Sequence, residues 1–262
     1  MKPSRSKLFE LHLDLLSETD RILVVGDLHG DYQSYRRIRT LFDPRRDYAI
    51  FLGDYADRGS EGIEVIDGVR KLLREHPDRV IALKGNHEDY ARSGQPTFYP
   101  CNLIEETERK RGGWQRYFSS TFQPFVEDLF LAVIIPNEIL FVHGGVSRKV
   151  YGLDDLRHPT EEVEKDVLWS DPFEGTGERP NRRGRGIEFG NDVTSEVCRR
   201  LGVKKLIRSH EPRKAFRGPY YEHDRRVITT STTSVYGGIP FVLTINPTTF
   251  VELSCYLEEV WS

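Results

Sequence analysis

Five short polar segments each follow an apolar run that predicts a β-strand. They read GDLHG after the run at 21–26, GDYADRG after 48–53, GNHE after 79–85, HGG after EILFV and SHEP after KKLIR. In open α/β folds, ligands bind beyond the carboxyl ends of the strands, so we expect these segments to meet at one edge. A single histidine after a strand is usually structural, but five polar segments at the same kind of position indicate a reactive site.

The first two segments contain a candidate metal-binding pair. Asp27 and His29 are two residues apart, and side chains at i and i+2 of extended backbone point the same way. This spacing suits two ligands on one ion. Asp54 ends the neighbouring strand and is our candidate for a carboxylate that bridges two ions.

The other segments supply a second set of ligands, Asn86, His143 and His210. Mixed oxygen and nitrogen donors without a thiolate suit Mn, Fe or Zn. Two divalent ions carry +4, and two aspartates with one bridging hydroxide carry −3, so the site would attract a phosphate dianion. Bound water would also lose its proton near neutral pH. A carboxylate in place of Asn86 would cancel the residual positive charge.

Strands and helices alternate over the first ninety residues, which indicates a parallel sheet covered on both faces. We expect helices over 31–42 and from Ser60 to just before Pro77, because apolar residues recur there at helical spacing. Residues 102–123 are predicted to be largely helical. The runs LFLAVIIP and EILFV around Pro136-Asn137 indicate an antiparallel hairpin.

A further helix is expected over 192–202, with Asp192 as N-cap and Gly202 just past its end. The tail alternates strand-like runs with turns at 237–238 and 246–247. No linker marks a boundary. We therefore predict one mixed α/β sandwich domain over 1–262, with its motifs between about 21 and 255.

Composition excludes several classes of protein. The net charge of −3 and pI near 6.3 argue against a general nucleic-acid binder. There is no signal-peptide core, and no window approaches the ~20 apolar residues of a membrane span. Cys101, Cys198 and Cys255 are sparse and odd in number, which favours reduced thiols and a cytoplasmic location.

In this order, GDLHG, GDYADRG, GNHE, HGG, LWSDP, RGRGIEFG and RSHEP resemble the phosphoprotein phosphatase (PPP) family of Ser/Thr phosphatases, within the calcineurin-like metallophosphoesterases. The likeness runs from about residue 21 to about 255. It implies a central β-sandwich of mixed sheets flanked by helices, with a dinuclear metal site at the C-terminal ends of the strands.

The resemblance also implies a role for each matching residue. Arg58 and Arg183 would bind phosphate oxygens, together with Asn86, and His87 would be the general acid, held by Asp57. The first metal ion would be bound by Asp27, His29 and Asp54, and the second by Asp54, Asn86, His143 and His210.

We therefore expect a metal-dependent phosphatase that uses two divalent ions, Mn first and Fe or Zn as alternatives. A metal-bridging hydroxide would attack phosphoserine or phosphothreonine in proteins directly, without a phosphoenzyme. The expected partners are phosphoprotein substrates, with no nucleic acid, no membrane and no regulatory subunit. The alternatives are a diadenosine tetraphosphate or other nucleotide hydrolase, and a non-catalytic phosphoprotein-binding scaffold.

Some residues of the motifs are left without a firm role. Asp171 of LWSDP is either part of the site or an ordinary Asp-Pro turn residue, and Tyr236 of STTSVYGG is displaced by one position from the family's tyrosine. Glu88 is expected to be structural and Asp89 a turn residue. Because neighbouring side chains of an extended segment point to opposite sides, we expect Asn86 and His87 to act on different partners.

Overall fold

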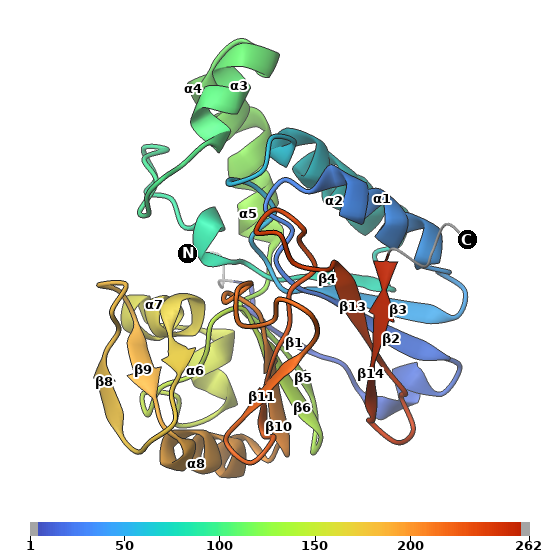
Figure 1. Cartoon of the computed structure of the whole chain (residues 1–262), viewed down its shortest axis with the longest axis vertical. Helices are drawn as coiled ribbons and strands as arrows, with labels where there is room; N and C mark the ends of the chain where they lie inside the picture. The colour runs from blue at the N-terminus through green and yellow to red at the C-terminus, as the bar shows by residue number, and fades with distance from the viewer. Residues whose placement is uncertain (1–4, 258–262) are drawn as a thin grey trace.

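The computed structural model describes residues 5–257, in which two β-sheets pack face to face and helices cover the outer face of each (Figure 1). The core between the sheets contains Ile22 and Ile50 from one sheet and Phe141 and Ile207 from the other. The alternate residues of the strands face the helices instead, as Leu23 does. The expected mixed α/β sandwich is confirmed. One face of the first sheet is covered by helices and the other by a second sheet.

The order of the strands within the described residues is mixed in both large sheets. The first sheet runs β14-β13-β2-β3-β4, with β2, β3 and β4 parallel. The second runs β1-β5-β6-β10-β12-β11, in which β6, β10 and β12 are parallel and β5 is antiparallel to β6. A small third sheet has the order β7-β9-β8. The strands are β1 (Leu8–Glu10), β2 (Arg21–Val25), β3 (Asp47–Phe51), β4 (Val80–Ala82), β5 (Ala132–Ile135), β6 (Ile139–Val142), β7 (Asp171–Pro172), β8 (Glu178–Pro180), β9 (Ile187–Phe189), β10 (Lys205–Arg208), β11 (Tyr220–Glu222), β12 (Val227–Thr229), β13 (Phe241–Ile245) and β14 (Glu252–Tyr256).

Helices α1 to α5 lie on the first sheet and α6 to α8 on the second. No helix within residues 5–257 is long and apolar enough to cross a bilayer. The helical segments are η1 (Leu13–Leu16), α1 (Tyr32–Leu41), α2 (Gly62–Glu75), η2 (Asn86–Glu88), α3 (Leu103–Arg111), α4 (Trp114–Tyr117), the π-helix η3 (Phe118–Phe122), α5 (Gln123–Asp128), α6 (Leu153–Arg157), α7 (Glu161–Trp169) and α8 (Asn191–Leu201).

The hairpin of β5 and β6 and the left-handed Gly202 after α8 agree with the prediction. Two predicted helix starts are wrong. Asp192 is not the N-cap of α8, because its carboxylate accepts from the backbone of Gly177 and from Arg148 instead. Helix α2 begins at Gly62 rather than at Ser60, and the carboxylate of Glu106 in α3 accepts from its first free N–H groups. Both errors arise from partners far away in the sequence.

Candidate active site

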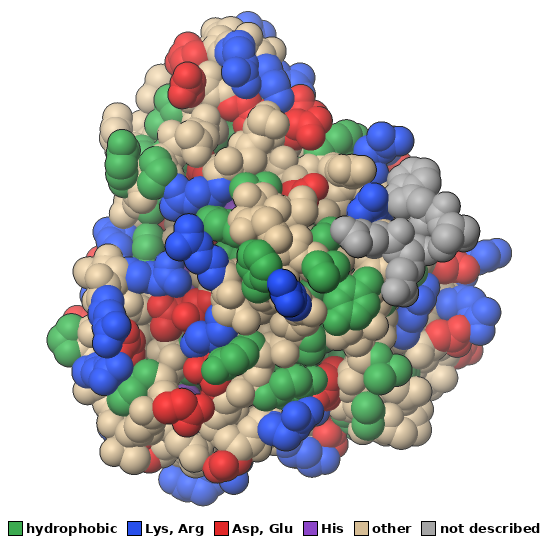
Figure 2. Space-filling model, viewed as in Figure 1, with side chains coloured by type: hydrophobic (Ala, Val, Ile, Leu, Met, Phe, Trp, Pro, Cys, Tyr) green, Lys and Arg blue, Asp and Glu red, His purple; other side chains and the backbone are tan. Residues whose placement is uncertain are grey.

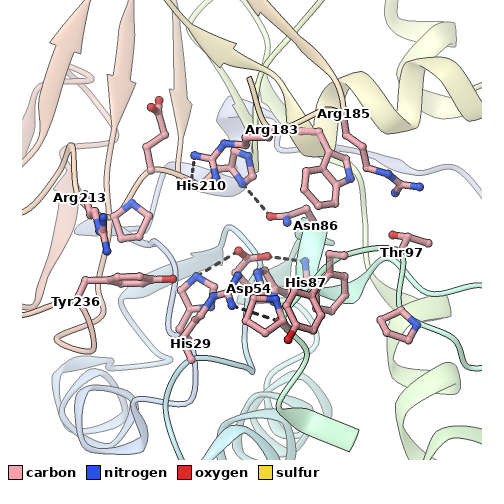
Figure 3. A pocket seen from close by; sticks show the side chains of 18 of the residues that line it. His29, Asp54, Asn86, His87, Thr97, Arg183, Arg185, His210, Arg213 and Tyr236 are labelled. Carbon is pink, nitrogen blue, oxygen red and sulfur yellow. Dashed lines mark hydrogen bonds and ion pairs between the residues drawn. The ribbon is translucent and has the colours of Figure 1, made fainter. Parts of the chain in front are cut away.

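The polar segments that follow β2, β3, β4, β6 and β10 meet at one edge of the two large sheets. They surround a cavity of about 1130 Å³, and Figure 3 shows His29, Asp54, Asn86, His87 and His210 around its centre. The structure thus brings together the residues that the sequence singled out, and buries most of them: Asp27, His29, Asp54, Asp57, Asn86, His87, His143 and His210.

One group of donor atoms is formed by His29 and two carboxylates. His29 Nδ1 lies 3.1 Å from the carbonyl oxygen of Ala56, to which it donates its proton. Its Nε2 therefore carries a lone pair, and lies 3.5 Å from Asp54 Oδ2 and 3.8 Å from Asp27 Oδ2. Burial lowers the pKa of His29 to about 4, so the ring is neutral at pH 7. His29 Nε2 thus offers a lone pair next to an oxygen of each carboxylate.

A second group is formed by His143, Asn86 and His210. His143 Nδ1 donates to the carbonyl oxygen of Leu52 at 2.9 Å, which leaves a lone pair on Nε2. This nitrogen lies 3.0 Å from Asn86 Oδ1, 3.2 Å from His210 Nδ1 and 3.4 Å from Asp54 Oδ1. Burial also lowers the pKa of His143 to about 4. Asp54 thus presents one oxygen to each group.

The two groups fit divalent cations. Asp27 Oδ2 is buried without a hydrogen-bond partner among residues 5–257, and buried polar atoms are rarely left so. Burial, followed by the charges of Asp27 and Glu88, raises the pKa of Asp54 well above its ordinary value. A cation would remove this repulsion and use the converging lone pairs. His87 also lies within reach of His29 and Asp54, but a different partner fixes its ring.

That partner is Asp57. The Oδ2 atom of Asp57 lies 2.7 Å from His87 Nδ1. Its Oδ1 accepts from the backbone N–H groups of Asn102 and Leu103 at the start of α3. Burial opposes the charge of Asp57, but these bonds and His87 together lower its pKa. The carboxylate is thus ionised, holds Nδ1–H of His87, and directs the opposite nitrogen to the cavity.

The backbone at these residues differs from the extended geometry expected from the sequence. His29 has φ of 47° and Asp54 has φ of 56°, both left-handed. Asn86 and His87 lie in the short helix η2. The side chains of His29, Asp54, Asn86 and His87 are therefore aimed by tight turns of the backbone, and not by the alternation of side chains along a strand. Left-handed non-glycine residues cost free energy, and they persist where surrounding contacts hold them.

Glu88 supplies such contacts. Its two carboxylate oxygens accept from the backbone N–H groups of Asp54, Tyr55 and Gly85, at 2.8 to 3.0 Å. The side chain is fully buried. It therefore connects the turn after β3 to the turn after β4. This is the structural role that was expected from the sequence, and it also sets the position of Asp54.

Two arginines point into the same cavity. Arg58 and Arg183 both line it. Arg58 follows Asp57 in left-handed conformation, and its Nη1 donates to the carbonyl oxygen of Pro100 at 3.3 Å. Arg183 Nε donates to Asp171 Oδ2 at 2.8 Å. Both guanidinium groups keep further N–H donors for an anion.

Asp171 is connected to the site by its contacts with two arginines. Besides Arg183, it accepts from Arg208 Nη2 at 2.8 Å and from Asn181 Nδ2 at 3.0 Å. Burial opposes the charge of Asp171, but His210 and the guanidinium groups of Arg208 and Arg183 hold its pKa well below its ordinary value. Arg208 is fully buried and was missed in the sequence. The available signal was its place at the end of the strand KKLIRS, as the first residue of the motif RSHEP, because a charge buried there needs a partner.

The segment between η2 and α3 was also missed. The Phe98 ring lies 4.4 Å from the His87 ring, and the His29 ring lies 4.9 Å from the same histidine. The Tyr236 ring is 5.6 Å from that of His29 and lines the cavity. No motif marks Phe98, so only the fold reveals that it packs on His87.

Comparisons with known proteins agree with this geometry. The model of the calcineurin-like phosphoesterase family matches residues 20–214. A serine/threonine-protein phosphatase of Caenorhabditis elegans is 30% identical over 214 residues, which cover 78% of this chain and 46% of that protein. The serine/threonine-protein phosphatase PP1-delta of the same organism is 34% identical over 218 residues, 78% of this chain and 68% of that protein.

A solved structure has a similar fold. A serine/threonine phosphatase of Saccharomyces cerevisiae, described as similar to human PP5, has a TM-score of 0.79 and 29% identity, covering 93% of this chain and 78% of that chain. A putative diadenosine tetraphosphatase has a TM-score of 0.56 at 16% identity, with coverage of 96% and 98%, which shows a shared fold alone. The chain spans about half the length of several curated relatives that it matches.

Proposed function

The chain belongs to the calcineurin-like phosphoesterase family, and from this premise we propose that it hydrolyses phosphate monoesters, namely phosphoserine and phosphothreonine in proteins. The observation that carries this proposal is the buried Asp57 and His87 pair beside the two groups of ligand atoms around His29 and His143. A serine or threonine alkoxide is a strongly basic leaving group and needs a proton as its bond breaks. The names of the matched relatives support the same substrate class.

In this proposal Asp27, His29 and Asp54 hold one divalent ion, and Asp54, Asn86, His143 and His210 hold the other. Two bound ions would lower the pKa of water from about 15.7 towards about 7 and make hydroxide available at neutral pH. His29 and His143 are neutral, and each has a lone pair on Nε2, which supports this assignment.

Substrate binding is assigned to Arg58 and Arg183, whose planar N–H forks match phosphate oxygens, with the amide of Asn86 beside them. Asp171 holds Arg183 in place and is a positioning residue. His87, with Nδ1 bound to Asp57, donates a proton from Nε2 to the leaving oxygen, a contribution of typically ~10²–10⁴-fold. Phe98 and His29 limit the rotation of its ring.

Mixed nitrogen and oxygen ligands favour Mn, with Fe or Zn as alternatives. We also propose that residues 1–262 form one catalytic domain with its motif core at about 21–255. Its partners would be phosphoprotein substrates rather than nucleic acid or membrane, without a dedicated regulatory subunit. A cytoplasmic location is supported by Cys101, Cys198 and Cys255, which form no disulfide with one another.

The test removes metal with a chelator, returns Mn, Fe, Zn, Mg or Ca singly, and compares four substrates. These are a phosphoserine peptide, p-nitrophenyl phosphate, diadenosine tetraphosphate and bis-p-nitrophenyl phosphate. We expect metal-dependent hydrolysis of the two monoesters. A preference for the dinucleotide would favour the nucleotide hydrolase, and the absence of turnover with any metal would favour a phosphoprotein-binding scaffold.

A further inference from the structure

The cavity carries more positive charge than the proposed phosphate contacts require. Besides Arg58 and Arg183, it is lined by Arg185, Arg213 and Lys214. Figure 3 shows Arg213 and Arg185 on opposite sides of the centre that His210 and Asn86 occupy. On the molecular surface, Lys and Arg side chains gather on the side that carries α7, β8 and β9, below the hairpin of α3 and α4 (Figure 2).

On one side, Arg213 is a cation that no carboxylate neutralises. It is exposed, and within residues 5–257 no Asp or Glu oxygen lies within ion-pair distance of it. Its guanidinium carbon is 5.9 Å from the centre of the Tyr236 ring. Figure 3 shows Tyr236 next to Arg213, with its hydroxyl end directed towards His29. A ligand that extends from the phosphate position past Tyr236 would meet this charge.

On the opposite side, Arg185 is only partly neutralised. Its Nη1 donates to Asp89 Oδ2 at 3.2 Å, and its side chain is 38% exposed. Asp89 is shared, because its other oxygen accepts from Lys84 at 3.1 Å. The remaining N–H groups of Arg185 are therefore available to a second anion.

Two acidic residues line the cavity, Asp54 and Glu211; Asp54 is a proposed metal ligand, and Glu211 does not cancel these charges. Glu211 is paired with the buried Arg208 and with Lys214 at 3.0 Å. Lys214 in turn contacts Glu222 at 2.9 Å. Arg208 also pairs with Asp171. The cations of this network are therefore matched by carboxylates, and the positive charge beyond the proposed phosphate ligands Arg58 and Arg183 comes from Arg213 and Arg185.

We propose that the cleft selects phosphorylated residues flanked by further anionic groups, such as Asp, Glu or a second phosphorylated residue of the same peptide. This inference rests on the proposed function, because it assumes a phosphopeptide in the cleft. A peptide that lies across the centre would place its flanking side chains near Arg213 on one side and Arg185 on the other. Exposed ion pairs contribute modestly, so we expect about a three- to tenfold preference in kcat/KM.

The experiment uses the full chain with Mn and phosphoserine peptides of equal length. One has Glu on both flanks, one has a second phosphoserine, one has Ala and one has Lys. Phosphate release gives kcat/KM for each at low salt and at 0.5 M NaCl. Diadenosine tetraphosphate is assayed in parallel. We expect the order Glu and phosphoserine flanks, then Ala, then Lys, with a smaller spread at high salt because ions screen exposed charges.

Variants assign the preference to residues. Arg213→Ala and Arg185→Ala should each reduce the Glu to Ala ratio of kcat/KM by about two- to threefold, and Arg213→Glu should reverse the ratio in favour of Lys flanks. The matched control is Arg217→Ala, an exposed arginine of the same segment that does not line the cavity. This variant should keep the ratio of the wild type.

Each outcome separates the two proposals. Hydrolysis of all four peptides at equal kcat/KM would overturn the inference and leave the proposed function standing. A preference that Arg213→Glu does not reverse would also overturn it. If no phosphopeptide were hydrolysed while the dinucleotide was, the proposed function would fail, and the second anion would be a phosphate of a nucleotide.

Discussion

Asp57 Oδ2 lies 2.7 Å from His87 Nδ1, and both side chains are buried. The backbone N–H groups at the start of α3 bind the other oxygen of Asp57. The carboxylate cannot turn away, so Nδ1 of His87 is fixed as a donor and Nε2 is the nitrogen left for a substrate. This geometry makes the acid role of His87 testable.

Replacement of His87 by Asn should reduce hydrolysis of phosphoserine peptides by about 10²- to 10⁴-fold. The loss on p-nitrophenyl phosphate should be much smaller, because nitrophenolate is a stable leaving group that needs no proton. The measurement is kcat on both substrates. The exposed His12, changed to Asn, is the control and should affect neither. Equal losses on the two substrates would remove His87 from the acid role.

The same residue predicts a dependence on pH. Burial lowers the pKa of His87 below its ordinary value of 6.5, although the hydrogen bond and charge of Asp57 oppose the shift. His87 acts as an acid only when protonated, and this fraction falls as the pH rises through the lowered pKa. The ratio of kcat/KM for phosphoserine peptide to that for p-nitrophenyl phosphate should therefore fall already below pH 6.5. A ratio that rises with pH would contradict the assignment.

Removal of metal should lower both activity and stability. At a metal concentration about 1,000 times Kd, binding contributes about 4 kcal/mol to folding, or about 10 °C in Tm for a chain of this size. Thermal melting with chelator and with added Mn measures the shift. In Asn86→Ala, which lacks one proposed ligand, the shift should be smaller. Identical melting curves with and without metal would argue against the ligand assignment.

Asp171→Asn should raise KM for phosphopeptides by about tenfold, because Arg183 loses its carboxylate. It should also lower the free energy of unfolding by about 3 kcal/mol, since the buried Arg208 loses part of its compensation. Steady-state kinetics and urea unfolding measure the two effects. Asp192→Asn is the matched control, because Asp192 also pairs with an arginine but is 38% exposed and lies outside the cavity. If the free energy of unfolding fell while KM stayed unchanged, Asp171 would have no role in substrate binding.

Glu88→Gln should weaken metal binding although Glu88 is no proposed ligand. A glutamine amide places an NH₂ group against one of the three N–H donors, so the turn that carries Asp54 would shift. We expect a loss of about 1–3 kcal/mol in stability and a higher Mn concentration for half-maximal activity. Glu75→Gln, which is surface exposed, serves for comparison. An unchanged Mn requirement would limit Glu88 to stability.

The sequence by itself determined which elements carry the site. Apolar runs followed by polar segments identified β2, β3, β4, β6 and β10, because a buried strand needs an unbroken apolar stretch and its end is where side chains reach solvent. The candidate residues found in this way, Asp27 and His210 among them, lie within one site in the structure. These signals are local, and local patterns can be read along the chain.

Only the tertiary structure decided how the side chains are aimed. The left-handed backbone of His29 and Asp54 replaces the expected strand alternation, and Glu88 and Glu106 fix turns that lie 33 to 44 residues away from them. Phe98 belongs to no motif, and Arg208, although it opens the motif RSHEP, was given no role from the sequence. Hydrogen bonds, buried ion pairs and ring contacts between distant segments have no period in the sequence, so they become visible only when the sheets and helices have packed.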